Sequence, residues 1–138
     1  MTQLNINVMD MIVDNLAAGM TISKALEAVY TKRKVAIPYD DKFADVSIDD
    51  LGVSKPTGNA LKREYMRTVR DIVNFAEAKG IKNVRNMGLA KCTETMEALL
   101  NYAWNHMDNN QRTKFLLSTV ERNESHINYE ALQASMTR

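Results

Sequence analysis

The chain has 138 residues, 45% of them hydrophobic, so it can bury a core and does not have a disordered composition. No run of about 18 apolar residues is present, which excludes a membrane-spanning helix, and the N-terminus lacks a signal-peptide pattern. The single cysteine excludes an internal disulfide, which favours a cytoplasmic protein. Five glycines and two prolines are few, and this favours helices.

The net charge of +1 conceals an uneven distribution of charge along the sequence. Residues 36–51 carry one lysine and five aspartates, a net charge of −4. Residues 52–91 carry nine Lys or Arg and three Asp or Glu, a net charge of +6. A single charged run is often ordinary solvated surface. The basic segment 52–91 is still the clearest sign of an anionic partner in the composition.

Residues 1–35 predict a pair of helices that meet at Gly19. The predicted buried stripe of the first helix is Met9, Ile12, Val13 and Leu16. Gly19 suits a left-handed cap, and Thr21 or Ser23 then opens the second helix. The predicted stripe of this second helix is Ile22, Ala25, Leu26, Val29 and Tyr30. A helix, a glycine turn and a helix also outline a helix-turn-helix, although most such pairs are plain helical hairpins.

Residues 36–51 contain Pro38 and five aspartates, which predicts a loop. The apolar residues expected to pin this region to the core are Val35, Ile37, Tyr39 and Phe43. A short helix is expected over 57–64. Thr68 and Asp71 have the spacing of a capping box, so we place a break at 65–67. The next helix is expected to end at Gly80 and to bury Val69, Ile72, Val73 and Ala76.

A long helix is expected to begin near 91–93, and a further helix covers about 110–122. The predicted stripe of the long helix is Met96, Leu99, Leu100, Ala103, Trp104 and Met107. Methionines at such positions, Met9 included, are expected to fill the core. The stretch "INYEAL" could add a docking helix to the polar tail. The sequence therefore predicts a compact all-α protein with a helical pair (1–35), an acidic loop (36–51), a helical domain (52–122) and a tail (123–138).

Catalytic and metal-binding candidates are few. Cys92 and His106 lie 14 residues apart on one predicted helix, which is about 21 Å of rise, too far for a nucleophile and its base. The aspartate pairs at 40–41 and 49–50 fit solvated charge. One cysteine and two histidines give no metal-ligand spacing. We therefore expect no enzyme, no cofactor and no metal site.

Residues 86–93 place Gly88 just before the predicted start of the long helix. Free backbone N–H groups and the positive end of the helix dipole favour an anion there, and Lys91 adds a charge. Lys82 and Arg85 lie just upstream. A short helix, a glycine hairpin and a helix with cations form the pattern by which a helix-hairpin-helix grips a DNA backbone. Many plain helix starts share this pattern.

Three blocks carry a family resemblance: "IDDLGVSKPTGNALK" (48–62), "TVRDIV" (68–73) and "NMGLAKCTETMEALL" (86–100). In their order and spacing, residues from about 47 to 107 resemble the C-terminal domain of the bacterial RNA polymerase alpha subunit. The resemblance implies a compact helical domain with a helix-hairpin-helix. It also implies binding to AT-rich DNA, through backbone and minor groove, and contacts with activators and sigma factors.

The resemblance assigns Asn59, Gly88 and Glu94 to a DNA surface. This sequence departs from the family pattern at Pro56, which replaces the chief DNA-contacting arginine, and at Ala90, which replaces a lysine. Lys91 also stands in place of a capping serine, so the capping box with Glu94 is lost. The cations that could replace the lost charge are Lys55, Lys62, Arg63 and Lys91.

Two functions follow as hypotheses. The first is a small DNA-binding regulator of transcription or a nucleoid-type protein, from a bacterium or a phage. Its candidate DNA-contacting residues are Lys55, Asn59, Lys62, Arg63, Lys82, Arg85, Gly88, Lys91 and Glu94. The alternative is a protein-interaction module that binds RNA polymerase, sigma or another host factor and not DNA. In a third possibility the acidic loop folds over the basic face and weakens DNA binding.

Overall fold

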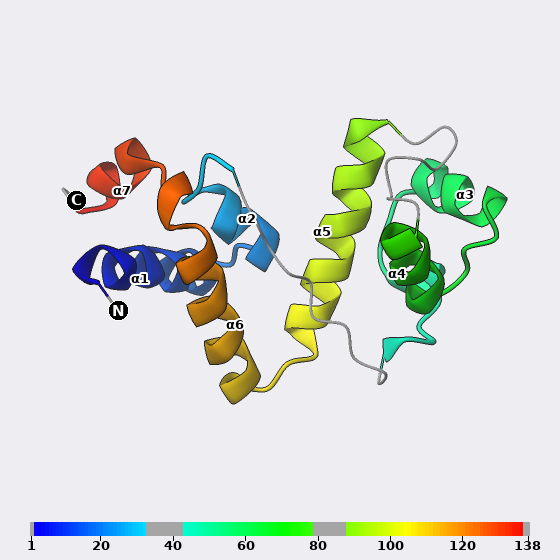
Figure 1. The fold of residues 1–138 in the computed structure, drawn as a ribbon, viewed down its shortest axis with the longest axis horizontal. Helices are drawn as coiled ribbons and strands as arrows, with labels where there is room; N and C mark the ends of the chain where they lie inside the picture. The colour runs from blue at the N-terminus through cyan, green and yellow to red at the C-terminus, as the bar shows by residue number, and fades with distance from the viewer. Residues whose placement is uncertain (1, 33–42, 79–87, 137–138) are drawn as a thin grey trace. The chain divides into compact units, whose positions relative to one another are not determined.

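The computed structural model describes residues 2–32, 43–78 and 88–136 (Figure 1). Its elements in sequence order are α1 (Gln3–Ala17), α2 (Ile22–Glu27), the 3-10 turn η2 (Ile48–Asp50), α3 (Lys55–Arg63), α4 (Val69–Ala78), α5 (Leu89–Asn105), α6 (Asn109–Arg122), the 3-10 turn η4 (Glu124–His126) and α7 (Tyr129–Met136). Within these ranges there is no strand, only isolated bridges between Tyr30 and Ile127 and between Ser47 and Thr68. The all-α prediction is confirmed. None of the described helices is long and apolar enough to cross a bilayer.

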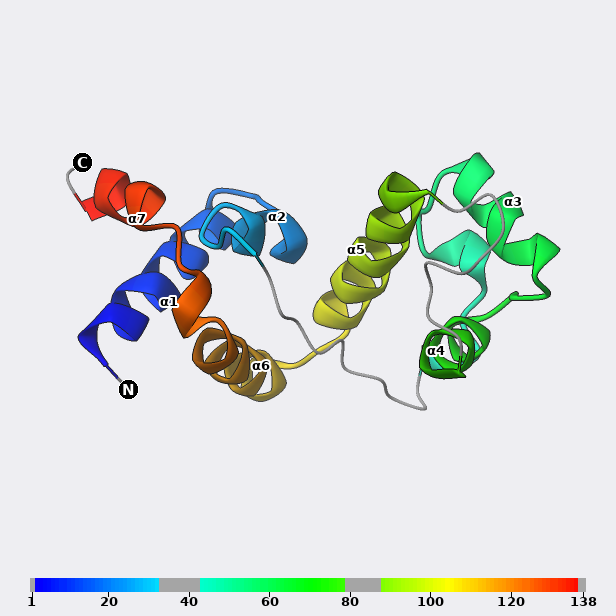
Figure 2. The same cartoon turned by 45° about the horizontal axis from the view of Figure 1, so that its top comes forward.

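The protein divides into two compact units. The terminal unit comprises residues 1–36 and 104–138, with α1, α2, α6 and α7, and the central unit comprises residues 37–103, with α3, α4 and most of α5 (Figure 2). α6 packs against α1 in the terminal unit, whereas the sequence pattern grouped 110–122 with the basic segment. The four ranges proposed from the sequence remain a prediction.

In the terminal unit the predicted turn at Gly19 and the predicted start of α2 are confirmed, but the predicted buried face of α1 is partly wrong. Gly19 has φ +96°, and the Thr21 side chain accepts a hydrogen bond from Lys24 N–H to start α2. All five residues of the predicted α2 stripe are buried. The stripe predicted for α1 is wrong at Val13, which is 48% exposed. The fully buried positions of α1 are Asn5, Val8 and Ile12.

Asn5 explains the displaced stripe. Its side-chain nitrogen donates to a carboxylate oxygen of Glu124, 119 residues later, so this polar residue is held inside the unit. A helix buries one face, and a buried face that includes Asn5 turns Val13 outward. The predicted docking helix at "INYEAL" is present as α7, in which Leu132 is buried.

The central unit is built around one apolar cluster. Its buried members are Ile48, Leu51, Ala60, Leu61, Met66, Val69, Ile72, Cys92 and Leu99. Phe43 packs against this cluster and meets Tyr102 edge-on, so its predicted role is confirmed. Val35, Ile37 and Tyr39 lie outside the described residues, as does the predicted helix end at Gly80.

The turn between α3 and α4 also agrees with prediction. Asp71 N–H donates to the Thr68 hydroxyl oxygen (3.4 Å), and Thr68 N–H donates to the Asp71 carboxylate (3.2 Å), as a capping box requires. The segment before α3 pairs with this turn through backbone hydrogen bonds, among them Ile48 N–H to Arg67 O (2.9 Å). The short helix and the long helix each begin two residues before their predicted starts.

The predicted core role of the methionines is wrong for Met96, which is exposed on α5. Met9 and Met107 are only partly buried. Thr95 takes the interior position beside Met96, and its hydroxyl donates to the Lys91 carbonyl (2.9 Å). This hydrogen bond allows a polar residue to be buried on the core face of α5.

Candidate nucleic-acid interface

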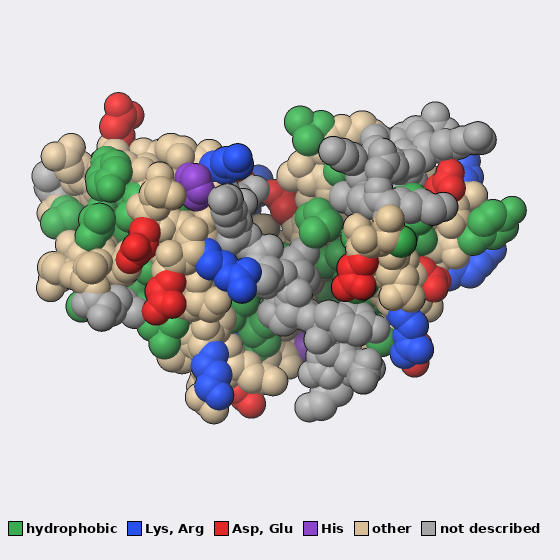
Figure 3. All heavy atoms as spheres, viewed as in Figure 1, with side chains coloured by type: hydrophobic (Ala, Val, Ile, Leu, Met, Phe, Trp, Pro, Cys, Tyr) green, Lys and Arg blue, Asp and Glu red, His purple; other side chains and the backbone are tan. Residues whose placement is uncertain are grey.

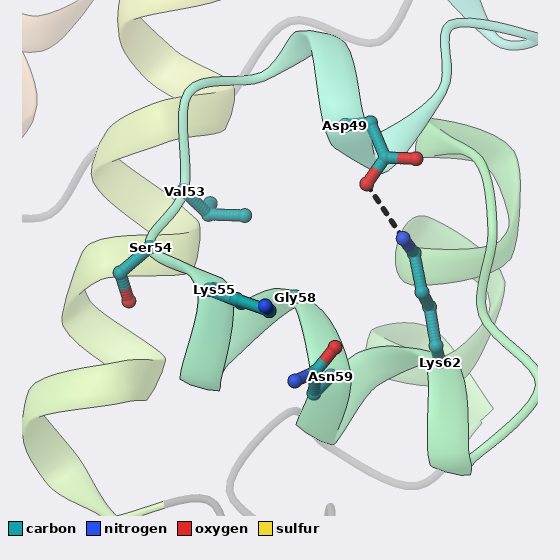
Figure 4. Close-up of a pocket in the computed structure, with 7 residues that line it drawn as sticks. All are labelled: Asp49, Val53, Ser54, Lys55, Gly58, Asn59 and Lys62. Atoms are coloured by element: carbon teal, nitrogen blue, oxygen red, sulfur yellow. Dashed lines mark hydrogen bonds and ion pairs between the residues drawn. The ribbon is translucent and has the colours of Figure 1, made fainter.

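The outer face of α3 borders a groove of about 330 Å³ (Figure 4). The groove is lined by Asp49, Val53, Ser54, Lys55, Gly58, Asn59 and Lys62. Lys55 and Asn59 are exposed, and neither side chain has a hydrogen bond or ion pair with any residue of the described ranges. A cation and an amide one helical turn apart are therefore both accessible to an external ligand.

The local sequence explains why α3 begins here. Pro56 lies in the first turn, where its fixed φ suits a helix and its missing N–H costs no internal hydrogen bond. Lys62 and Arg63 lie in the last turn, where cations oppose the negative end of the helix dipole. Pro56 thus starts the helix that presents Lys55 and Asn59, although it cannot make the contact of an arginine.

Lys62 differs from Lys55, because it already has a partner. Its Nζ lies 2.6 Å from Asp49 Oδ1, and the two side chains meet across the groove (Figure 4). Asp45 and Arg70 form a second pair at 3.3 Å. Two aspartates of the acidic segment thus pair with two cations of the basic segment, and any anion that binds Lys62 competes with Asp49.

Glu94 projects from α5 to the start of α3. Its carboxylate accepts hydrogen bonds from Ser54 N–H, from the Ser54 hydroxyl (3.1 Å) and from the Thr57 hydroxyl (2.8 Å). Ser54 is the N-cap of α3 and makes no side-chain cap bond of its own. Glu94 therefore accepts, from another helix, the N-cap N–H bond that the third helical residue accepts in a capping box.

The same bonds set the ionisation of Glu94. Burial by itself raises the pKa of a carboxyl, but the hydrogen bonds from Ser54 N–H, the Thr57 hydroxyl and the Ser54 hydroxyl, together with the Lys91 charge, lower the pKa of Glu94 below its ordinary value. Glu94 is thus held as a carboxylate. The resemblance assigned it to the DNA surface, and in this structure its carboxylate joins α3 to α5.

Gly88 and Lys91 lie at the start of α5, as predicted, but Gly88 is not required by the backbone. Its φ is not in the left-handed region, and a Cβ built on it meets no heavy atom within 4 Å. The Gly88 carbonyl accepts from Cys92 N–H (3.1 Å), which places it at the helix start. Lys82 and Arg85 lie outside the described residues. On the face drawn in Figure 3, Lys and Arg side chains are scattered among Asp and Glu rather than gathered in one patch.

The metal-ligand candidates among the described residues do not form a site. Among the described residues no three His, Cys, Asp or Glu side chains come together as metal ligands. Cys92 is buried on α5, and His106 follows the end of that helix.

Sequence reasoning missed three features of this surface. The partners of Glu94 at Ser54 and Thr57 are about 40 residues away, and no local pattern signals them. The pairing of Asp49 with Lys62 was likewise not visible. The left-handed conformation of Tyr65 was also missed. The sequence holds a signal for it, because no glycine follows α3 at the position where a left-handed helix cap normally has one.

Comparisons with known proteins agree with this arrangement. The family model for the C-terminal domain of the bacterial RNA polymerase alpha subunit matches residues 37–101, somewhat less than half of the sequence. The DNA-directed RNA polymerase alpha subunits of two strains of Tropheryma whipplei, Twist and TW08/27, are each 35% identical over 63 residues. That match covers 46% of this protein and 19% of each relative, so the protein spans about a fifth of the length of these relatives. No solved structure matches significantly.

The matched residues coincide with the central unit, and the matched family is a DNA-binding and interaction domain without catalytic function. The expected resemblance is confirmed. The central unit is therefore similar to the C-terminal domain of the bacterial RNA polymerase alpha subunit, and this protein carries a module like that domain.

Proposed function

We propose that the central unit binds duplex DNA and that the protein acts in transcription as a small regulator or a nucleoid-type protein in the cytoplasm. The observation that carries the proposal is the outer face of α3, where Lys55 and Asn59 are exposed and unpaired within the described structure beside an open groove. A lysine suits a phosphate oxygen, and an amide suits the acceptors of the minor groove. The similarity of residues 37–101 to a DNA-binding family supports the same assignment.

The proposed contact depends on backbone charge and groove shape more than on base edges. Pro56 cannot donate a hydrogen bond, and Ala90 offers no charge, so the remaining donors are lysines, arginines, one amide and helix-start N–H groups. Phosphate contacts fix position without reading sequence, while an AT preference arises from minor-groove width. We therefore expect modest affinity, strong salt dependence and a weak AT preference.

Fluorescence anisotropy with AT-rich and GC-rich duplexes across a salt series tests the proposal. We expect binding that weakens with salt, with a slope that corresponds to roughly two to five phosphate contacts. Lys55→Glu should weaken binding to both duplexes alike. Lys114→Glu makes the same charge change on an exposed position of α6 and serves as the control. Absence of binding at low salt, or equal loss in both variants, would contradict the proposed surface.

The second candidate function is binding to RNA polymerase, sigma or another host protein without DNA. The observation that favours it is the pairing of Lys62 with Asp49, which leaves the α3 face with less free charge than a dedicated DNA surface would keep. Biolayer interferometry with purified RNA polymerase core, holoenzyme and free sigma tests it. Saturable binding to one of these, together with no DNA binding at moderate salt, would select this function.

A further inference from the structure

Tyr65 is the most unusual residue of the central unit. It follows α3 with φ +63°, and no other non-glycine residue of the described ranges has a positive φ. It is also 86% exposed. A bulky residue in the left-handed region is strained, and an exposed aromatic ring adds nothing to the core. Neither the strained backbone nor the exposed ring of Tyr65 stabilises the fold, so we looked for a role of this side chain in binding.

Backbone hydrogen bonds hold Tyr65 in this conformation. Met66 N–H donates to Leu61 O (3.1 Å) and Tyr65 N–H donates to Lys62 O (3.0 Å), which is the Schellman pattern that ends many helices. Met66 is buried and belongs, with Leu61, to the apolar cluster of the central unit. Glycine is the usual residue at the Tyr65 position of this motif, because it lacks a Cβ.

The turn is anchored on its other side too. Arg67 N–H donates to the Asp71 carboxylate (2.9 Å), and Arg67 O accepts from Ile48 N–H (2.9 Å). The tyrosine ring is therefore displayed by a turn that is fixed at both ends. A fixed turn presents a side chain to a partner with little ordering cost.

Cations lie two residues to either side of Tyr65, whereas its immediate neighbours are the acidic Glu64 and the buried Met66, so residues 63–67 carry a net charge of +1. Arg63 and Arg67 are exposed, and neither side chain has a hydrogen bond or ion pair with the rest of the described structure. Arg63 lies four residues after Asn59 and eight after Lys55, so all three share the outer face of α3. From Lys55 to Arg63 the helix rises about 12 Å, which is the axial length of three to four base pairs of duplex.

We propose that residues 63–67, the Tyr65 turn, form a second contact with the DNA backbone beyond the groove. The inference rests on the proposed DNA binding and extends its footprint. Arg63 and Arg67 would meet phosphate oxygens, and Tyr65 would lay its ring against a deoxyribose while its hydroxyl donates to a phosphate. Tyrosine and arginine side chains both make such backbone contacts in protein–DNA complexes.

DNA fits this turn better than an acidic protein segment, because the turn continues the same helix face that carries Lys55 and Asn59. A ligand that covers that face reaches Arg63 by extending along the helix. The strain at Tyr65 is then explained by its position, since glycine there would end α3 equally well but could not touch the ligand.

The test compares Tyr65→Gly with the wild type in two measurements, thermal unfolding and anisotropy with a 24-base-pair AT-rich duplex. Glycine relieves the strain, so we expect a higher melting temperature together with binding on the order of fivefold weaker, as expected for the loss of one hydrogen bond to the backbone. Tyr129→Ala removes an exposed tyrosine of α7 and should leave the affinity unchanged. Hydroxyl-radical footprinting should also lose protection at one edge of the site.

The outcomes separate this inference from the proposed function. Wild-type binding with a weaker but more stable Tyr65→Gly protein supports the second contact. Wild-type binding that Tyr65→Gly leaves unchanged overturns the second contact and leaves the α3 surface intact as a DNA site. Failure of the wild type to bind DNA overturns both, and a difference between the two proteins in binding to purified RNA polymerase would then assign the turn to a protein partner.

Discussion

The carboxylate of Glu94 on α5 accepts a hydrogen bond from the hydroxyl of Thr57 on α3 at 2.8 Å. Thr57 is completely buried, and the same carboxylate accepts from Ser54 at the N-cap. One acidic side chain thus ties the start of α3 to the long helix of the central unit. This contact sets the orientation of the helix that carries Lys55 and Asn59.

Glu94→Ala should therefore destabilise the central unit. It removes the only acceptor that the described structure shows for Ser54 N–H and leaves the buried Thr57 hydroxyl with a bond to Ser54 alone. Loss of a capping interaction costs about 1–2 kcal/mol. Urea denaturation followed by circular dichroism measures the change. Glu121→Ala, on an exposed position of α6, is the control and should change the free energy of unfolding by less than roughly 0.5 kcal/mol.

The lowered pKa of Glu94 makes its contribution to the free energy of unfolding depend on pH. A carboxyl whose pKa is lower in the folded than in the unfolded state stabilises the fold above its unfolded pKa, which is about 4.3. This contribution is lost as the pH falls through the folded pKa. The stability gap between the wild type and Glu94→Gln should thus be full at pH 6–7 and shrink below about pH 4. A gap that stays constant down to pH 3 would show that the charge of Glu94 is not what stabilises α3.

Features of the fold that depend on residues close together in the sequence were predicted correctly. Helix starts were predicted well where the cap lies within four residues, as at Thr21 and Thr68, because the signal is local. The buried stripe of α2 followed from its spacing for the same reason.

The failures have a different origin, since they depend on partners distant in the sequence. Val13 was misplaced because Asn5 is buried against Glu124, 119 residues away. The bonds from Ser54 and Thr57 to Glu94 were not predicted, because these partners come from another helix; the assignment of Glu94 to a DNA surface rests on the resemblance and stays a prediction. A pattern of spacing reports which face is apolar, but not which polar residue finds a buried partner.

Tyr30 offers a prediction in the terminal unit. Its ring is buried, its hydroxyl has no hydrogen-bond partner in the described structure, and burial raises its pKa to about 12. Burial disfavours the ionised phenol in the folded state, so the free energy of unfolding should fall by roughly 2 kcal/mol as the pH rises from the unfolded pKa of about 10 to about 12. Tyr30→Phe should be neutral or slightly stabilising at pH 7, and should flatten the alkaline decline in unfolding free energy. An unchanged alkaline decline would assign it to other groups.

Arg112 should stabilise the junction after α5. Its guanidinium lies 4.7 Å from the centre of the Trp104 ring, and Nε and Nη2 donate to the Trp104 carbonyl at 3.1 and 3.0 Å. A lysine cannot reproduce the planar pair of donors, so Arg112→Lys should cost about 1–2 kcal/mol. Trp104 is the single tryptophan, so its fluorescence in urea reports the change directly. Arg112 and Arg122 both lie on α6, and Arg122 is exposed, so Arg122→Lys serves as the control and should leave the free energy of unfolding unchanged.

The ion pair between Asp49 and Lys62 leads to the last prediction. An exposed pair contributes little to stability, but Asp49 occupies the lysine that an incoming phosphate would need. Asp49→Asn should therefore leave the unfolding free energy nearly unchanged and strengthen DNA binding about threefold to tenfold at low salt, with a salt slope steeper by about one phosphate contact. Asp50→Asn removes the neighbouring exposed carboxylate, for which the described structure shows no ion pair, and controls for the change in net charge alone. If both variants strengthen binding equally, the effect comes from general charge and not from the release of Lys62. If only Asp49→Asn does, the acidic segment weakens DNA binding through this one contact.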